Sequence, residues 1–245
     1  MAEAVNFLLK GALAVEIALA AENISKRYGA KQALAQTCVS FAEHSFTCIV
    51  GRSGCGKTTL LRVLGGLEQT DSGSVQLAAG KKIAPVFQEA RLMPWLTVAE
   101  NITLAAQADK SLDKVRLPKL LQQLGLNGCE KLYPHELSGG MAQRVSLGRT
   151  LFYNPDILLM DEPFSALDYF TRQGLQQTLL DLYFAERKTI IFVTHDVEEA
   201  LLLADNVLIM KHGEVMDNVS VQLPRPRRAA SSDFQNLRQK ILQAL

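Results

Sequence analysis

Residues 51–59 read Gly-Arg-Ser-Gly-Cys-Gly-Lys-Thr-Thr, and this stretch decides the fold that we predict for the chain. It follows an apolar run at Phe46–Val50 and precedes a helix-like run at residues 60–64. A strand, a G-x-x-x-x-G-K-[ST] loop and a helix in that order are typical of a phosphate site, because backbone N–H groups and the positive end of the helix surround the phosphate oxygens. An ordinary glycine turn is the alternative, but all the fixed motif positions are filled. Lys57 would add positive charge for the outer phosphates, and the Thr58 hydroxyl would hold Mg²⁺. The nucleotide-binding residues predicted here are Gly51, Arg52, Ser53, Gly54, Cys55, Gly56, Lys57, Thr58 and Thr59.

The composition is that of an ordinary globular protein with one large domain or two small ones: 245 residues, 48% of them hydrophobic and 21% charged. The net charge of +1 argues against a dedicated nucleic-acid-binding protein, which usually has a basic excess. The four cysteines include no C-x-x-C pair and are interpreted as reduced thiols of a cytosolic protein. Because Glu3, Lys10 and Glu16 interrupt the apolar N-terminal stretch, we expect neither a cleaved signal peptide nor a spanning helix there.

Apolar runs separated by turn residues indicate a mixed α/β organisation. Strands are predicted at residues 14–23, 38–41 and 46–50, around Val75, and at 83–87, where Pro85 indicates an edge strand. Residues 97–154 have helical spacing and form a predicted helical block. Strands at 156–160, 189–193 and 206–210 then alternate with a helix at 171–187 and a further helix. This alternation favours a mostly parallel sheet flanked by helices, with the helical block inserted between its strands.

The last 22 residues, 224–245, differ from the rest of the chain, which is taken as one domain over residues 1–223. Residues 224–228 read Pro-Arg-Pro-Arg-Arg and cannot form regular helix or sheet. These arginines are interpreted as a solvated linker, and contact with anionic lipid or a partner is the alternative. Phe234, Leu237, Ile241 and Leu245 then recur at helical spacing and predict a short amphipathic helix.

Polar side chains follow three of the predicted strands at the point where each strand ends. Asp161 and Glu162 end the strand at 156–160, His195 follows the strand at 189–193, and Gln88 follows the strand at 83–87. Ligands gather at the carboxyl ends of parallel strands, so we expect these groups near the glycine loop. Asp161 would hold Mg²⁺ and Glu162 would polarise an attacking water. His195 would donate to the γ-phosphate, and the Gln88 amide would reach the metal or the water.

Ser138, Gly139 and Gly140 begin another predicted helix, with Ser138 as its N-cap. A helix start of this composition is a second anion-binding end, although plain capping explains it equally well from the residues alone.

The order of these motifs resembles the ATP-binding subunit of ABC transporters over nearly the whole chain. Residues 51–58 are similar to the Walker A loop, 157–162 to Walker B with its catalytic glutamate, and 137–141 to the signature. Gln88 falls at the Q-loop, Asp168 ends the Ser-Ala-Leu-Asp of the D-loop, His195 falls at the switch histidine, and Tyr28 fits the aromatic that stacks on adenine. The resemblance implies a P-loop NTPase core with an N-terminal antiparallel β part and an inserted helical subdomain.

The same resemblance implies ATP and Mg²⁺ as ligands and a head-to-tail homodimer, in which Ser138–Gly140 of one subunit cap the γ-phosphate held by residues 51–58 of the other. Two narrower features, residues 87–102 (FQEARLMPWLTVAENI) and the tail at 224–228, resemble importer ATPases for nitrate, taurine and aliphatic sulfonates. They imply a peripheral subunit on the cytoplasmic face of the inner membrane. Arg91 to Trp95 would line the groove for a membrane permease, with local core packing as the compatible alternative, and an extracytoplasmic substrate-binding protein would act indirectly.

Two departures and several alternatives accompany this interpretation. Met141 replaces the glutamine usual at the end of the signature, and Gly174 lies inside a predicted helix. A soluble ABC-type ATPase of DNA repair or translation is the main alternative function, but the chain has neither sustained heptads nor a second cassette. Glu162 and His195 argue against a non-hydrolysing nucleotide-binding module. An exporter is disfavoured because exporters often fuse the cassette to membrane helices.

Overall fold

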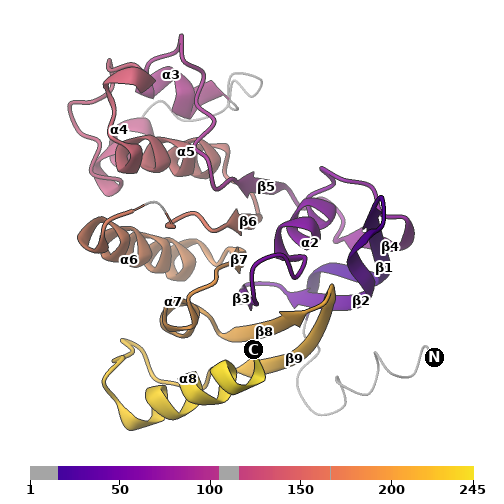
Figure 1. Ribbon diagram of the computed structural model, residues 1–245. Helices are drawn as coiled ribbons and strands as arrows, with labels where there is room; N and C mark the ends of the chain where they lie inside the picture. The colour runs from indigo at the N-terminus through magenta and orange to yellow at the C-terminus, as the bar shows by residue number, and fades with distance from the viewer. Residues whose placement is uncertain (1–15, 105–115, 166) are drawn as a thin grey trace.

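The computed structural model describes residues 16–104, 116–165 and 167–245 (Figure 1). Part of the predicted first strand, part of the helical block and Ala166 of the D-loop-like motif lie outside these residues. Among the described helices, none combines the length and the apolar character that a membrane span requires.

A six-stranded sheet forms the centre of the molecule, in the order β5-β6-β7-β3-β8-β9. The first five strands are parallel and β9 pairs antiparallel with β8. The predicted parallel sheet is confirmed, and Pro85 lies on the edge strand β5 as expected. Strand β9 had not been predicted, because its alternation is weak and only Val219 in it is buried. The strands are β3 (Phe46–Val50), β5 (Ile83–Val86), β6 (Ile157–Asp161), β7 (Thr189–Val193), β8 (Asn206–Lys211) and β9 (Glu214–Ser220).

A second sheet is antiparallel, in the order β2-β1-β4, with strands β1 (Ile17–Tyr28), β2 (Lys31–Ala42) and β4 (Ser72–Leu77). Strands β1 and β2 are longer than the predicted 14–23 and 38–41. The polar residues beyond the predicted end of the first strand at residue 23 stay paired, since Lys26 faces Leu34 and Arg27 faces Gln32. Backbone pairing on both sides of the central strand β1 therefore outweighs the lack of apolar side chains.

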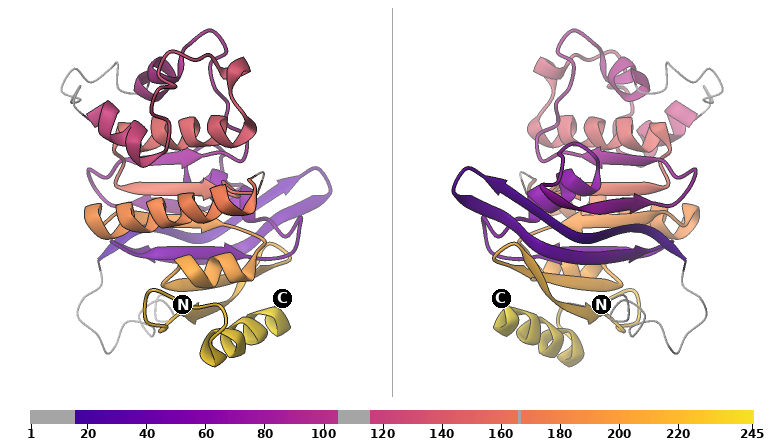
Figure 2. Two further views of the ribbon diagram at one scale, coloured as in Figure 1. Left: turned by 90° about the vertical axis from the view of Figure 1, so that its left-hand side faces the viewer. Right: turned by 90° about the vertical axis from the view of Figure 1, so that its right-hand side faces the viewer.

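Helices cover the six-stranded sheet on one face, and the antiparallel sheet with α2 (Lys57–Leu64) covers the other (Figures 1 and 2). Alternation along each strand creates the two cores. In β3, Cys48 packs into the larger core under the helices, whereas Ile49 packs into the smaller core under α2 and β1. The helices of the larger core are α3 (Val98–Thr103), α4 (Arg116–Gln123), α5 (Gly139–Tyr153), α6 (Tyr169–Glu186), α7 (Val197–Leu203) and α8 (Ser232–Ala244).

Helices α3, α4 and α5 gather beyond the β5 edge of the sheet and form the inserted helical unit (Figure 1). Inside α6, a Cβ at Gly174 would meet no atom within 4 Å, so nothing in the structure explains this glycine.

The C-terminal segment packs onto the main core. Phe234 and Ile241 of α8 are fully buried in the larger core, which confirms the predicted amphipathic helix. The solvated-linker interpretation is wrong for Arg225 and Arg227. Arg225 donates to Asp205 Oδ1 at 2.8 Å. The Arg227 guanidinium donates to four backbone carbonyls, those of Leu201, Ala204, Val221 and Leu223. Burial, and then the neighbouring Arg225, lower the pKa of Arg227 to about 10, so it stays charged at neutral pH.

Candidate functional site

The glycine loop between β3 and α2 is closely packed at Gly51 and Gly56, while Arg52, Ser53 and Gly54 are exposed. Gly54 and Gly56 have positive φ angles of 77° and 106°, which disfavour any residue with a side chain. A Cβ at Gly51 would lie 2.4 Å from the Met210 carbonyl, so packing also requires glycine there. Lys57 opens α2 and folds back over the loop, where its Nζ donates to the Gly51 carbonyl at 2.8 Å and to the Arg52 carbonyl at 3.2 Å. The ammonium group is therefore held within the loop, and Lys57 as a whole is only 6% exposed.

A hydroxyl and a carboxylate adjoin this loop. Thr58 Oγ1 donates to Asp161 Oδ1 at 3.1 Å. Burial raises the pKa of the Asp161 carboxyl, and the hydrogen bond from Thr58 lowers it in part. The negative charge of Glu162 raises this pKa further. Two hard oxygens side by side suit Mg²⁺, which accepts one or two protein ligands and takes the remainder from water and phosphate. No cluster of three or more His, Cys, Asp or Glu side chains able to hold a metal occurs in the described residues, so a complete protein cage is absent from that part of the chain.

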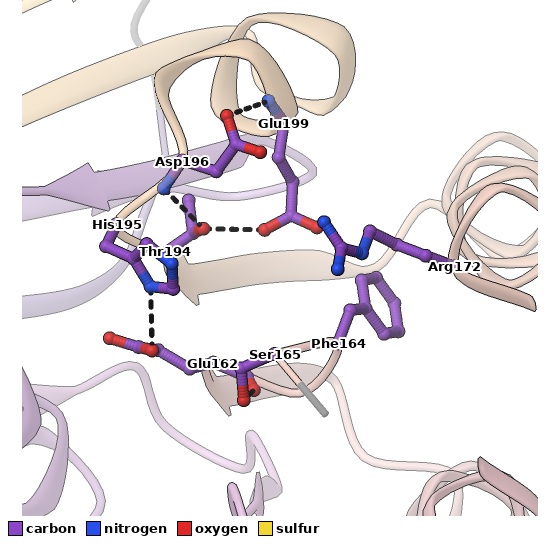
Figure 3. A pocket seen from close by; sticks show the side chains of 8 residues that line it. All are labelled: Glu162, Phe164, Ser165, Arg172, Thr194, His195, Asp196 and Glu199. Carbon is purple, nitrogen blue, oxygen red and sulfur yellow. Dashed lines mark hydrogen bonds and ion pairs between the residues drawn. The ribbon is translucent and has the colours of Figure 1, made fainter. Parts of the chain in front are cut away.

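Glu162 and His195 form a second pair at the ends of β6 and β7. His195 Nδ1 lies 2.9 Å from Glu162 Oε2 (Figure 3). The two strands are neighbours in register, since Asp161 faces Val193. Glu162 takes the left-handed conformation at φ 44°, and its N–H still donates to the Val193 carbonyl at 3.0 Å. The positive φ turns the chain away from the strand immediately after the carboxylate.

The order of the strands explains how these groups meet. Strand β7 lies between β3 and β6, so the glycine loop, His195 and the two carboxylates follow three neighbouring strands at one edge of the sheet. Gln88 follows the edge strand β5 at the same end and is exposed. Tyr28 ends β1 with 44% of its surface exposed. Its pKa is raised by partial burial and by Glu68, and a hydrogen bond with Thr59 of α2 opposes this.

Ser138 caps α5, with its Oγ accepting from the Met141 N–H at 3.2 Å, as predicted. Gly139 is exposed, and a Cβ there would meet no atom within 4 Å. A Cβ at Gly140 would lie 3.4 Å from Leu167, so the signature-like turn adjoins the D-loop-like segment. No hydrogen bond in the described parts of the chain joins residues 138–140 to the glycine loop. The Met141 side chain packs against the larger core, which accounts for an apolar residue at this position.

Asp168 is the N-cap of α6, and its Oδ1 accepts from the Thr171 N–H at 3.0 Å. Hydrogen bonds from Thr171 hold the pKa of this carboxyl below its ordinary value. The helix therefore begins at residue 169, two residues before the predicted start.

The segment after Gln88 contains residues that the sequence had not singled out. Asn101, fully buried in α3, accepts from the Met93 N–H and donates to the carbonyls of Met93, Leu96 and Thr97. Such a residue is visible in a sequence only as one more polar position in a helix, and nothing in the pattern indicates its burial.

On the other side of the segment, Arg149 of α5 donates to the carbonyls of Ala90 and Arg91. Between these supports Trp95 remains 70% exposed, while Leu92 packs against the core. The core-packing interpretation therefore holds for Leu92, whereas Trp95 is left open to solvent.

Comparison with known proteins decides the family. The family described as ABC transporter matches residues 34–165, more than half of the chain. This chain belongs to the ABC transporter family. A relative from Paracoccus denitrificans named aliphatic sulfonates import ATP-binding protein SsuB 1 is 39% identical over 232 residues, which cover 95% of each chain. SsuB from Bacillus subtilis is 42% identical over 212 residues, covering 83% of each. The recognised family is therefore confirmed.

Solved structures agree with the fold of this ABC protein. The ATP-binding cassette MJ0796, a dimer in a post-hydrolysis state bound to ADP and Pi, has a TM-score of 0.77 and 29% identity, with 84% of this chain and 100% of that chain covered. The cbiO1 protein from Clostridium perfringens, part of the transporter complex cbiONQ, has a TM-score of 0.73 and 25% identity, with coverage of 84% and 90%. The predicted fold class is confirmed: a mostly parallel sheet with helices and a separate antiparallel sheet.

Proposed function

We propose that this chain binds and hydrolyses ATP as the energising subunit of an ABC importer for a small solute of the nitrate, sulfonate or taurine type. The observation that carries the hydrolytic part is the Glu162–His195 pair at 2.9 Å, at the same sheet edge as the Thr58–Asp161 pair. A carboxylate held by an imidazole suits a base that orients and deprotonates water. The names of the curated relatives, import ATP-binding proteins over most of the chain, support the importer.

In this proposal the chain's own groups divide the work. The loop N–H groups and Lys57 hold the outer phosphates, Tyr28 stacks on the adenine, and Thr58 with Asp161 provides two oxygens for Mg²⁺. Mg²⁺, when bound, supplies positive charge that neutralises the phosphates. Glu162 takes a proton from water while His195 donates a hydrogen bond to the γ-phosphate, and the Gln88 amide reaches the metal or the water.

The subunit is proposed to act as a homodimer. Ser138 and Gly139 are exposed, and a Cβ at Gly139 would meet no atom of the described residues within 4 Å, so this turn is open to a surface that approaches from outside. A phosphate bound to a second copy fits that description, because the turn is a capped helix start with free N–H groups. Asp168, beside this turn through Leu167, would lie in the same interface. The dimeric state of the related cassette MJ0796 supports this arrangement.

A membrane permease is the proposed partner of the segment from Arg91 to Trp95. An exposed tryptophan on a loop fixed by buried hydrogen bonds is a preorganised anchor, the type of residue that dominates binding energy at interfaces. The subunit would then lie at the cytoplasmic face of the inner membrane as a peripheral protein, and an extracytoplasmic binding protein would deliver the solute to the permease. The alternative of a soluble ATPase in DNA repair or translation is not favoured by the import-related relatives.

The test uses tagged Glu162→Gln protein purified from native membranes with ATP. This variant should bind ATP, lower turnover by about a hundredfold or more, and remain a trapped dimer with its permease. Turnover like that of the wild type would remove Glu162 as the base. Recovery of soluble or DNA-bound partners alone would favour the alternative function.

Adding Trp95→Ala to this variant should release the permease and leave the dimer intact. Met216→Ala, which truncates another exposed apolar side chain on β9, is the matched control and should release nothing. Equal release by both variants would remove Trp95 as the anchor.

A further inference from the structure

Close to the Glu162–His195 pair lies a carboxylate to which no role has been given. Glu199 lies in α7 and is only 7% exposed. Each of its oxygens accepts a hydrogen bond: Oε2 from the Thr194 hydroxyl at 2.6 Å and Oε1 from the Gln176 amide at 2.9 Å. Burying a carboxylate costs free energy, and the hydrogen bonds to its two oxygens offset this cost. The offset requires that both donors stay within hydrogen-bonding distance of the carboxylate.

One of these donors controls the backbone on which His195 stands. Thr194 directly precedes His195, and its hydroxyl also accepts from the Asp196 N–H at 3.0 Å. The Thr194 hydroxyl therefore accepts from the residue after His195 and donates to Glu199 (Figure 3). These two hydrogen bonds fix the backbone on both sides of His195. The His195 side chain is 65% exposed, and within the described residues its polar contact is with Glu162. The direction of the imidazole therefore depends on the backbone more than on surrounding side chains.

The other donor belongs to α6, the helix that follows the D-loop-like segment. Gln176 lies one turn beyond Arg172, which lines the same pocket as Glu199 (Figure 3). Arg172 Nη2 donates to the Leu167 carbonyl at 3.0 Å. Leu167 in turn adjoins Gly140 of the signature-like turn. One buried carboxylate thus connects the end of β7 with α6 and, through Arg172, with the segment after Glu162.

We propose that Glu199 is a positioning residue for hydrolysis, which holds His195 within hydrogen-bonding distance of Glu162 through Thr194. Through Gln176 and Arg172 of α6, Glu199 also fixes the position of this pair relative to the D-loop-like segment. This role rests on the proposed ATPase function. It follows that a displacement of Leu167 or Asp168 by a second copy is transmitted to the His195 backbone through α6.

The first experiment compares the full-length chain with Glu199→Ala and with Glu198→Ala, an exposed glutamate in the same first turn of α7. Glu199→Ala should lower kcat about tenfold, the loss expected when one orienting hydrogen bond disappears, while KM stays within about twofold. Glu198→Ala should change neither. Thr194→Val should reproduce the loss and Thr194→Ser should restore activity, because serine retains the hydroxyl.

A second measurement separates positioning from folding. In a His195→Ala background, Glu199→Ala should lower kcat less than about twofold, because its effect passes through the missing imidazole. The chain has four histidines, so ring proton resonances are assignable by NMR with the His195→Ala variant as reference. Glu199→Ala and Thr194→Val should move the His195 resonances and leave those of His44, His135 and His212 in place.

The proposal would be overturned if Glu199→Ala lowered kcat by the same factor with and without His195→Ala. It would also be overturned if the His195 resonances stayed unchanged while kcat fell. If Glu199→Ala does not fold, Thr194→Val carries both tests. If the wild-type chain itself does not hydrolyse ATP, the proposed function fails, whereas the NMR comparison still decides whether Glu199 positions His195.

Discussion

Asn101→Ala should loosen the loop that presents Trp95. The Asn101 side chain is fully buried and bonds four backbone groups of this loop. Two of the four keep another partner, since the Met93 carbonyl also accepts from Leu96 N–H and the Thr97 carbonyl from Asn101 N–H. The substitution therefore leaves two groups unpaired, the Met93 N–H and the Leu96 carbonyl. Two unsatisfied groups at about 1–3 kcal/mol each cost about 2–6 kcal/mol, and the better helix propensity of alanine offsets about 0.5 kcal/mol of this. Because water hydrates part of the freed groups, the expected loss lies in the lower half of the range, at about 2–3 kcal/mol.

Denaturant and thermal unfolding measure this loss, which corresponds to a decrease in Tm of about 4–12 °C for a chain of this size. Trp95 is the only tryptophan, so its fluorescence anisotropy reports the loop directly and should decrease in the variant. Asn127→Ala, the same substitution at an exposed position, is the matched control and should stay within about 0.5 kcal/mol of wild type. Equal stability and equal anisotropy for the two variants would refute the argument that Asn101 holds the loop.

Three further predictions concern the nucleotide loop, the C-terminal helix and the buried carboxylate. Lys57→Ala should weaken ATP binding about a hundredfold, because a charge held inside the loop is lost; near-normal affinity in a titration would contradict the assigned site. Phe234→Ala should cost about 3–5 kcal/mol in denaturant unfolding, whereas Leu242→Ala on the exposed side of α8 should cost less than about 0.5 kcal/mol. Burial raises the pKa of Glu199 above its ordinary value of 4.5, so the folded state retains a proton that the unfolded state has lost. The free energy of unfolding should therefore fall as pH rises above about 4.5, and Glu199→Gln should flatten this fall; parallel curves for the two proteins would be inconsistent with it.

Much of the site could be predicted because its signals are local. The spacing from Gly51 to Thr58 requires only a strand, a turn and a helix that are adjacent in the chain. Asp161 and His195 were placed correctly because each follows a short buried strand, and the carboxyl ends of parallel strands share one edge. The capping role of Ser138 is likewise a property of four consecutive residues.

Other features depend on contacts between residues far apart in the sequence. The arginines of the tail could not be distinguished from solvated ones, because the carbonyls that Arg227 binds lie at the end of α7 and beside β9. The length of β1 was underestimated for the same reason, since pairing partners on both sides rather than apolar side chains hold its polar end.

The sequence by itself determined the strand, glycine loop and helix around residues 51–59, most of the order of strands and helices, and which polar groups follow the strands, because these follow from short-range geometry and periodicity. Only the tertiary structure decided which strand separates Asp161 from the glycine loop, which polar residues are buried, and that Glu199 joins the His195 turn to α6. Hydrogen bonds across long sequence separations determine these features, and they exist only after the sheet and the two cores have formed.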